Sequence, residues 1–247
     1  GEGITSLGQL LFNKCTVAES VSLPSTLTKM SDTKVAKYGT FRECTSLKTV
    51  TMPANLEMIG PYCFLDCTAL TTVILNDKLT SIGTYAFNGC TALKSIKFPD
   101  SLTSIGLSSF EGCTDLTTVT YGMGMTETGN MAFRNASVSK INFSSTITEI
   151  SPWGFFGCNF VKLEIPETVT KINIRGFANC TAFQENPDDI TLPPQKISGG
   201  ITPEIIPRVE KPFQYVLCGD EQSYKPKRKI FYRKHLQAPI KEGTIIG

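Results

Sequence analysis

The stretch "AFNGCTALKSIKFPDSLTSIG" (Ala86–Gly106) decides the fold of this chain, because near-copies of it recur along most of the sequence. It opens with a Phe-x-x-Cys unit and continues with Leu-x-x-Ile-x-Phe, a proline and Leu-x-x-Ile-Gly. A cysteine that returns at one place in every copy is either a chemical site or a packing device. The spacing of the copies and the residues around each cysteine distinguish these two roles.

The copies follow a nearly constant period. Aligned on phenylalanine, they are separated by 29, 23, 23, 23, 23, 22 and 22 residues. The aligned residues are Phe12, Phe41, Phe64, Phe87, Phe110, Phe133, Phe155 and Phe177. A fixed period in the twenties is typical of a solenoid with one supersecondary unit per turn. The longer first step predicts a protruding loop between Met30 and Phe41.

The apolar positions within each unit predict a short strand. After Cys44 they are Leu47, Val50 and Met52, in the pattern Leu-x-x-Leu-x-Leu. Because side chains alternate along a strand, Val50 and Met52 point inward and their neighbours point outward. Pro53 ends the strand, since proline cannot donate to the next ladder hydrogen bond. The residues left in each unit are too few for a full helix, which predicts turns or short 3₁₀ segments.

The pattern Leu-x-x-(Val/Ile)-x-(Leu/Phe)-Pro-x-x-Leu-x-x-Ile-Gly-x-x-Ala-Phe-x-x-Cys resembles the BspA-like class of leucine-rich repeats from about Ile4 to Pro193. The resemblance implies a right-handed leucine-rich-repeat solenoid with a parallel β-sheet on one face and turns or 3₁₀ segments on the other. It also implies a protein of microbial surfaces, found mostly in oral and gut anaerobic bacteria and mucosal protists, that adheres to host matrix proteins or to other microbes. We therefore expect about 7–8 repeats of 22–23 residues over residues 1–193, the first incomplete, followed by a Pro-rich basic cap or small β segment over 194–247.

The nine cysteines are an odd number, so a fully paired disulfide framework within one chain is excluded. Stacked turns place Cys44, Cys67, Cys90 and Cys113 in a column about 4.8 Å apart, which does not provide the tetrahedral ligand set of a zinc ion. Ala136 takes the cysteine position in one unit, so a small apolar side chain suffices there. Buried structural thiols are the favoured interpretation, a disulfide or redox role is the alternative, and no cofactor or metal is expected.

The outward positions of the predicted sheet are the candidate partner-binding residues, because solenoids bind partners through such extended surfaces. They are Lys48, Thr49, Thr51, Thr71, Thr72, Lys94, Ser95, Lys97, Thr117, Thr118, Thr120, Lys140 and Asn142. The alternative is a soluble face with no partner, because threonine favours strands and lysine protects sheet edges. This face carries no aromatic residue and no arginine, the usual hot-spot types.

The C-terminal segment carries the strongest charge cluster of the chain. Its basic residues are Lys225, Lys227, Arg228, Lys229, Arg233 and Lys234. They are candidate contacts for a polyanion such as an acidic glycan, and a solvated hairpin loop is the alternative.

Composition and motifs argue against several other functions. The net charge of +2 argues against a dedicated nucleic-acid binder, and no apolar stretch reaches the roughly 18–20 residues of a membrane span. Motifs of hydrolases, phosphate-binding loops and metalloproteases are absent, and the single histidine, His235, lies outside the repeats. The sequence thus predicts a non-catalytic, secreted or cell-surface adhesion module that binds an extracellular-matrix or cell-surface protein. A structural spacer and a glycan or polyanion binder remain the alternatives.

Overall fold

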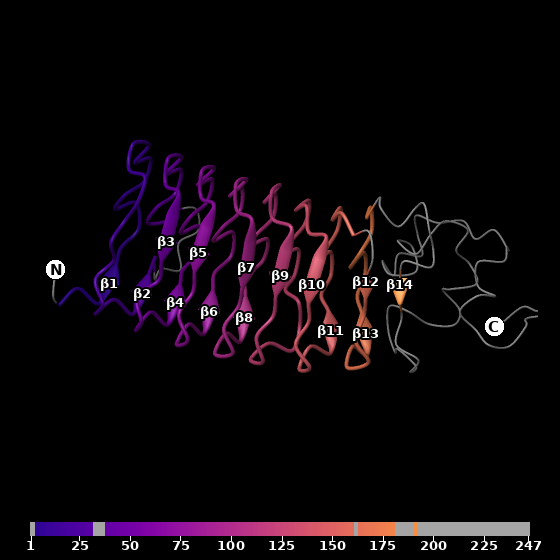
Figure 1. The fold of residues 1–247 in the computed structure, drawn as a ribbon. Coiled ribbons are helices and arrows are strands. Elements are labelled where there is room, and N and C mark those ends of the chain that lie inside the picture. Colours follow the sequence, from indigo (N-terminus) through magenta and orange to yellow (C-terminus); the bar gives the residue numbers. More distant parts are fainter. Residues whose placement is uncertain (1–2, 32–37, 161–162, 181–189, 192–247) are drawn as a thin grey trace, which may run out of the picture.

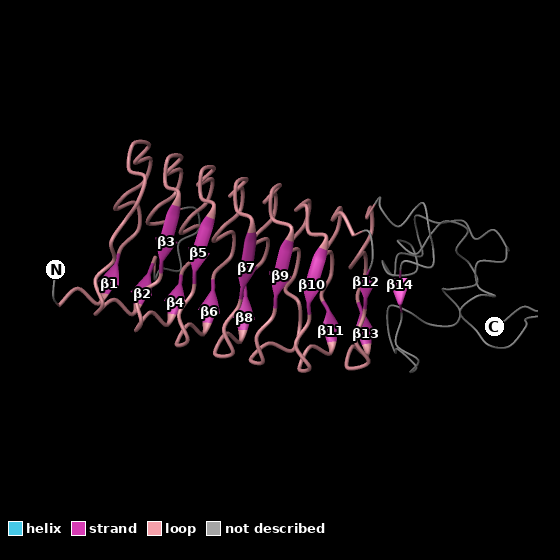
Figure 2. Cartoon of the chain, viewed as in Figure 1, coloured by secondary structure: helices cyan, strands magenta, loops and turns pink. Residues whose placement is uncertain are grey.

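The computed structural model describes residues 3–31, 38–160, 163–180 and 190–191. The chain coils into an elongated stack of turns, and its strands form two parallel rows along the stack (Figure 1). These residues contain strands and turns and no helix (Figure 2). The predicted leucine-rich-repeat solenoid is confirmed, and its outer segments are turns.

The first row of strands is the predicted Leu-x-x-Leu-x-Leu ladder, which we call the sheet face. It consists of β3 (Thr49–Thr51), β5 (Thr72–Ile74), β7 (Ser95–Lys97), β9 (Thr118–Thr120), β10 (Lys140–Asn142), β12 (Leu163–Glu164) and β14 (Ile190–Thr191). All pairings are parallel and in register, as in Ser95↔Thr118↔Lys140. The central residues Val50, Ile96 and Val119 are buried, which confirms the predicted alternation.

A second row of strands, which the sequence analysis did not predict, lies at the Leu-x-x-Ile segment of each turn. It consists of β1 (Ser6–Leu7), β2 (Lys29–Met30), β4 (Met58–Ile59), β6 (Ser81–Ile82), β8 (Ser104–Ile105), β11 (Glu149–Ile150) and β13 (Lys171–Ile172). Strands β1, β2, β4, β6 and β8 pair in this order as one sheet. A single bridge between Glu127 and Glu149 then joins the turn after β8 to β11. The structure therefore has this second row of strands in addition to the predicted sheet. The fold has two parallel ladders per turn, because each Ile side chain is buried while the backbone beside it pairs with the next turn.

The core is a continuous column of phenylalanine rings. Neighbouring rings are 5.0–5.4 Å apart and within 12° of parallel from Phe12 to Phe177. This spacing is close to the separation of about 4.8 Å between paired strands, so the strand ladders and the ring stack share one repeat. All of these rings except Phe12 at the first turn are buried.

The turn beside each phenylalanine is held by a third set of backbone hydrogen bonds. The amide of Phe87 donates to the carbonyl of Ser109 in the next turn, at 2.8 Å, and Phe64 pairs in the same way with Ala86. Residues two places after the phenylalanine have positive φ, as in Asp66 (57°) and Gly89 (70°). Asn, Asp and Gly tolerate this left-handed backbone best, which explains their recurrence at that place.

Candidate interaction surface

The predicted partner-binding residues lie together on the sheet face, in three columns that run along the solenoid. The first column is Lys48, Thr71, Lys94, Thr117 and Ser139, and each amide after Lys48 donates to the carbonyl of the residue before it in this column. The hydroxyls of Thr71 and Thr117 donate to the carbonyls of Lys48 and Lys94, at 3.1 and 3.3 Å. The backbone and these hydroxyls fix the position of each side chain in the column.

The other two columns follow the strand register. One contains Thr49, Thr72, Ser95, Thr118 and Lys140, and the other contains Thr51, Ile74, Lys97, Thr120 and Asn142. These side chains are exposed or half-buried. Asn142 donates to the hydroxyl of Thr120 at 2.9 Å, and Ile74 exposes an apolar side chain in the middle of the face. The structure therefore brings all thirteen predicted residues onto one surface.

Two of the lysines on the sheet face form ion pairs. Lys48 lies 2.8 Å from Glu19, and Lys94 lies 2.5 Å from Asp115. Both pairs are largely exposed, so water screens them and they contribute little to stability. Within the part of the chain that the structure describes, no acidic side chain pairs with Lys97 or Lys140. The central part of the sheet face is therefore positively charged.

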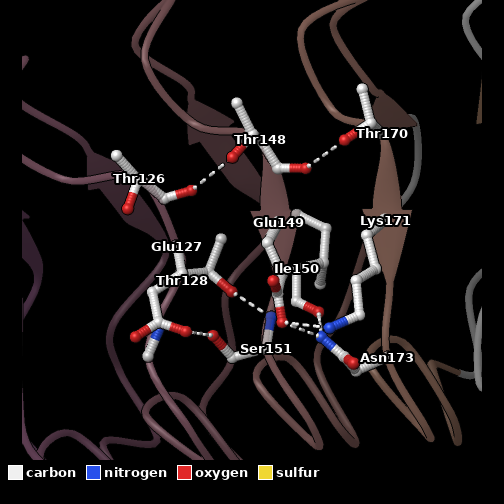
Figure 3. Close-up of polar contacts among 11 residues, drawn as sticks. Thr126, Glu127, Thr128, Thr148, Glu149, Ile150, Ser151, Thr170, Lys171 and Asn173 are labelled. Carbon is white, nitrogen blue, oxygen red and sulfur yellow. Dashed lines mark hydrogen bonds and ion pairs between the residues drawn. The ribbon is translucent and has the colours of Figure 1, made fainter. Parts of the chain in front are cut away.

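The second row of strands carries a different set of polar contacts, shown in Figure 3 for three successive turns. Thr148 donates to the carbonyl of Thr126, and Thr170 donates to that of Thr148, at 3.3 and 3.4 Å. Glu149 accepts from Lys171 at 3.0 Å and from Asn173 at 2.5 Å. Burial opposes ionisation of Glu149, but these two hydrogen bonds and the charge of Lys171 lower its pKa.

Ser151 connects the same network to the buried side of the turn. Its hydroxyl donates to Glu127 at 3.2 Å and accepts the amide of Gly129 at 3.0 Å, while its own amide donates to the hydroxyl of Thr128 (Figure 3). A nucleophilic serine needs a base that takes its proton, and the only histidine of the chain is His235. Among the described residues this network holds successive turns together, and it contains no histidine.

Aromatic and arginine side chains gather on the turns next to the phenylalanine column, at positions for which the sequence predicted no interaction site. Tyr62 and Tyr85 stack at 5.2 Å. The guanidinium of Arg175 lies 4.5 Å from the ring centroid of Trp153, and that of Arg134 lies 5.6 Å from it. Trp, Tyr and Arg are the common hot-spot residues of interfaces. Aligning the residue two places before each phenylalanine would have placed Tyr62, Tyr85 and Trp153 at the same position of their turns.

From Cys44 on, the repeated cysteines are buried and hydrogen-bonded between turns, while Cys15 in the first turn is half-buried. The thiol of Cys90 donates to the carbonyl of Phe64 at 3.1 Å, and Cys67, Cys113, Cys158 and Cys180 make the same bond one turn apart. Burial raises the pKa of Cys113 to about 12, which keeps its thiol protonated. Among the described residues no group of three or more His, Cys, Asp or Glu side chains could hold a metal ion. The packing role of these cysteines therefore includes a turn-to-turn hydrogen bond.

The C-terminal candidates lie outside the described residues, as do the predicted domain boundary at 193–194 and most of the predicted loop before Phe41. The basic cluster from Lys225 to Lys234 and the proposed cap over 194–247 stay predictions. In the described part of the chain, no helix is both long and apolar enough to cross a membrane.

The two strand ladders, the phenylalanine column and the extended polar face define a leucine-rich repeat protein whose architecture suits protein interaction. The profile of the BspA-type leucine-rich repeat region matches six copies, over residues 1–37, 33–162 and 148–195. The chain belongs to this BspA-type leucine-rich repeat family, which confirms the resemblance found in the sequence.

Solved structures of bacterial leucine-rich repeat proteins have the same fold. A leucine-rich repeat protein from T. pallidum is 19% identical with a TM-score of 0.57, over 74% of this chain and 73% of that chain. One from Bacteroides ovatus is 22% identical with a TM-score of 0.54, over 72% of this chain and 57% of that chain. One from Eubacterium ventriosum is 18% identical with a TM-score of 0.52, over 81% and 79%. A search of curated proteins found no match.

Proposed function

We propose that this chain is a non-catalytic recognition module of an extracellular or cell-surface protein, and that it binds a partner protein through the sheet face. The single observation that supports this most is the rigid, continuous array of exposed side chains on β3, β5, β7, β9 and β10. Its backbone is fixed by hydrogen bonds in every turn, so a partner meets a surface that needs little ordering on binding.

The charge of the face supports a partner with acidic groups. Lys97 and Lys140 have no acidic partner among the described residues, and the pairs of Lys48 and Lys94 are exposed. The partner class proposed here is an extracellular-matrix protein or a protein on another cell, in line with the surface adhesion that the BspA-like resemblance implies. A glycan is the alternative partner.

The test is a binding screen of extracellular-matrix proteins and neighbouring cells, followed by charge reversal of Lys48, Lys94 and Lys97 to glutamate. We expect the triple variant to lose binding while it keeps the far-UV circular dichroism of the parent. Lys78→Glu, at an exposed residue of a turn outside the sheet face, is the matched control and leaves binding intact. Unchanged affinity of the triple variant for a confirmed ligand would show that the partner binds elsewhere.

A further inference from the structure

The lysines of the sheet face lie on alternate turns of the solenoid. From β3 to β10, Lys48 precedes β3, Lys94 precedes β7 and Lys140 begins β10, while the intervening strands β5 and β9 contain no charged residue. Main-chain hydrogen bonds place Lys48 and Lys94 in one column, two turns apart. Two steps of about 4.8 Å separate such turns by about 9.6 Å along the solenoid axis.

This spacing matches one extended peptide conformation. A polyproline II helix has three residues per turn and rises about 3.1 Å per residue, so side chains on every third residue lie on one side about 9.3 Å apart. Resting on the proposed function, and naming the partner of that same surface, we propose that the sheet face binds an acidic polyproline II segment. The segment lies along the solenoid axis, across the strands, with an Asp or Glu on every third residue facing Lys48, Lys94 and Lys140.

The rest of the face suits such a segment. A polyproline II helix makes no internal hydrogen bonds, so its backbone groups need partners outside the helix. The hydroxyls of Thr49, Thr72 and Thr118 lie in the column next to Lys48 and Lys94, and Lys140 continues this hydroxyl column. Ile74, which is 53% exposed, offers an apolar contact to a proline ring. Charged, hydroxyl and apolar side chains thus lie on the same face.

The second row of strands shows why the segment selects the sheet face. Its outward residues include Glu57, Glu127 and Glu149 besides Lys29 and Lys171, and Lys171 pairs with Glu149. The carboxylates of Glu57 and Glu127 repel an acidic chain, because like charges that face each other are unfavourable. On the sheet face, the ligand carboxylates compete with Glu19 and Asp115 for Lys48 and Lys94, and both existing pairs are exposed and weak. Removal of Asp115 therefore frees Lys94 for the ligand.

The experiment measures the affinity of the full chain for two labelled peptides of equal composition by fluorescence anisotropy at low salt. One is six repeats of Glu-Pro-Pro, and the other is three repeats of Glu-Glu-Pro-Pro-Pro-Pro, which breaks the period. We expect the periodic peptide to bind at least about fivefold more tightly, the gain of roughly one matched charge contact. Lys94→Ala weakens its binding by a similar factor, Asp115→Asn strengthens it, and the control Lys78→Ala leaves it unchanged.

Equal binding of the two peptides, or binding that ignores Lys94→Ala, would overturn the proposal. A hyaluronan oligosaccharide of similar length is the second arm: tighter binding than the periodic peptide, with loss on Lys94→Ala, would assign the face to an anionic glycan instead. If a matrix protein binds through this face and the periodic peptide does not compete with it, the polyproline II inference fails and the proposed function stands. If neither the screen nor the peptides give a ligand that depends on this face, both fail.

Discussion

Replacing Cys90 by alanine tests what the repeated cysteine contributes. Its side chain is fully buried and its thiol donates to the carbonyl of Phe64 at 3.1 Å. Removing the sulfur loses about 1 kcal/mol of burial, and a further fraction through the small cavity and the weak thiol hydrogen bond. In this variant the carbonyl of Phe64 still accepts a hydrogen bond from the backbone amide of Cys67, so it is not left without a donor. We expect Cys90→Ala to destabilise the protein by about 1.5–2 kcal/mol.

Urea unfolding followed by far-UV circular dichroism, in the presence of a reductant, measures this loss. The chain contains its own matched control, because Ala136 is buried at the position that a cysteine takes in neighbouring turns. Ala136→Cys completes the column of thiols and should add up to about 1 kcal/mol. A Cys90→Ser variant keeps a donor and loses the apolar sulfur, so it separates the two contributions. Equal stability of Cys90→Ala and the parent would refute the packing role.

Three further predictions concern stability. Burial raises the pKa of Cys63 and Cys113 from 9.0 to about 12, so the unfolded chain releases their protons first. Each therefore lowers the free energy of unfolding by about 1.4 kcal/mol per pH unit between pH 9 and 12, and urea midpoints that stay flat above pH 9 would contradict this. Gly122→Ala places a Cβ 2.3 Å from the carbonyl oxygen of Pro99 and should cost about 3 kcal/mol or more, whereas Gly112→Asn, at φ +72° with no close neighbour, should change stability by less than about 0.5 kcal/mol in the same urea assay. The buried hydroxyl of Tyr121 donates to Thr128 at 2.9 Å, so Tyr121→Phe should lower the unfolding free energy by about 1–1.5 kcal/mol, and no change would show that this bond is dispensable.

The phenylalanine period made the fold predictable, because each ring must meet the next ring at the spacing of paired strands. The second row of strands was missed because each of its strands is two residues long, too short for an alternating pattern. The sequence Thr-Ser-Ile recurs at Thr80–Ile82 and Thr103–Ile105, and its β-favouring Thr and Ile indicate a strand at this place. Short strands of this kind form only because the neighbouring turn presents the same backbone in register.

The outward positions of the sheet face followed from alternation, but their electrostatics did not. Glu19 and Asp115 pair with lysines of neighbouring turns, and such pairs depend on how far each side chain reaches between turns. The aromatic surface near Trp153 was missed for another reason. The residue two places before phenylalanine is Tyr in two copies, then Ser, Met, Trp and Arg, so no single residue type repeats there.

Substitutions at outward positions of this solenoid and substitutions at inward positions have nearly independent effects. Binding to a partner can therefore be tested separately from stability. The side chains of Lys48 and Lys94 are 56% and 63% exposed, and their ion pairs are of the exposed kind that contributes about 0–1 kcal/mol. Reversing their charge therefore leaves the phenylalanine and cysteine columns in place. A buried substitution such as Cys90→Ala perturbs the column while the lysines stay where the backbone holds them. If adhesion follows the lysines and stability follows the column, a loss of binding in the charge variants reports a lost contact with the partner and not a lost fold.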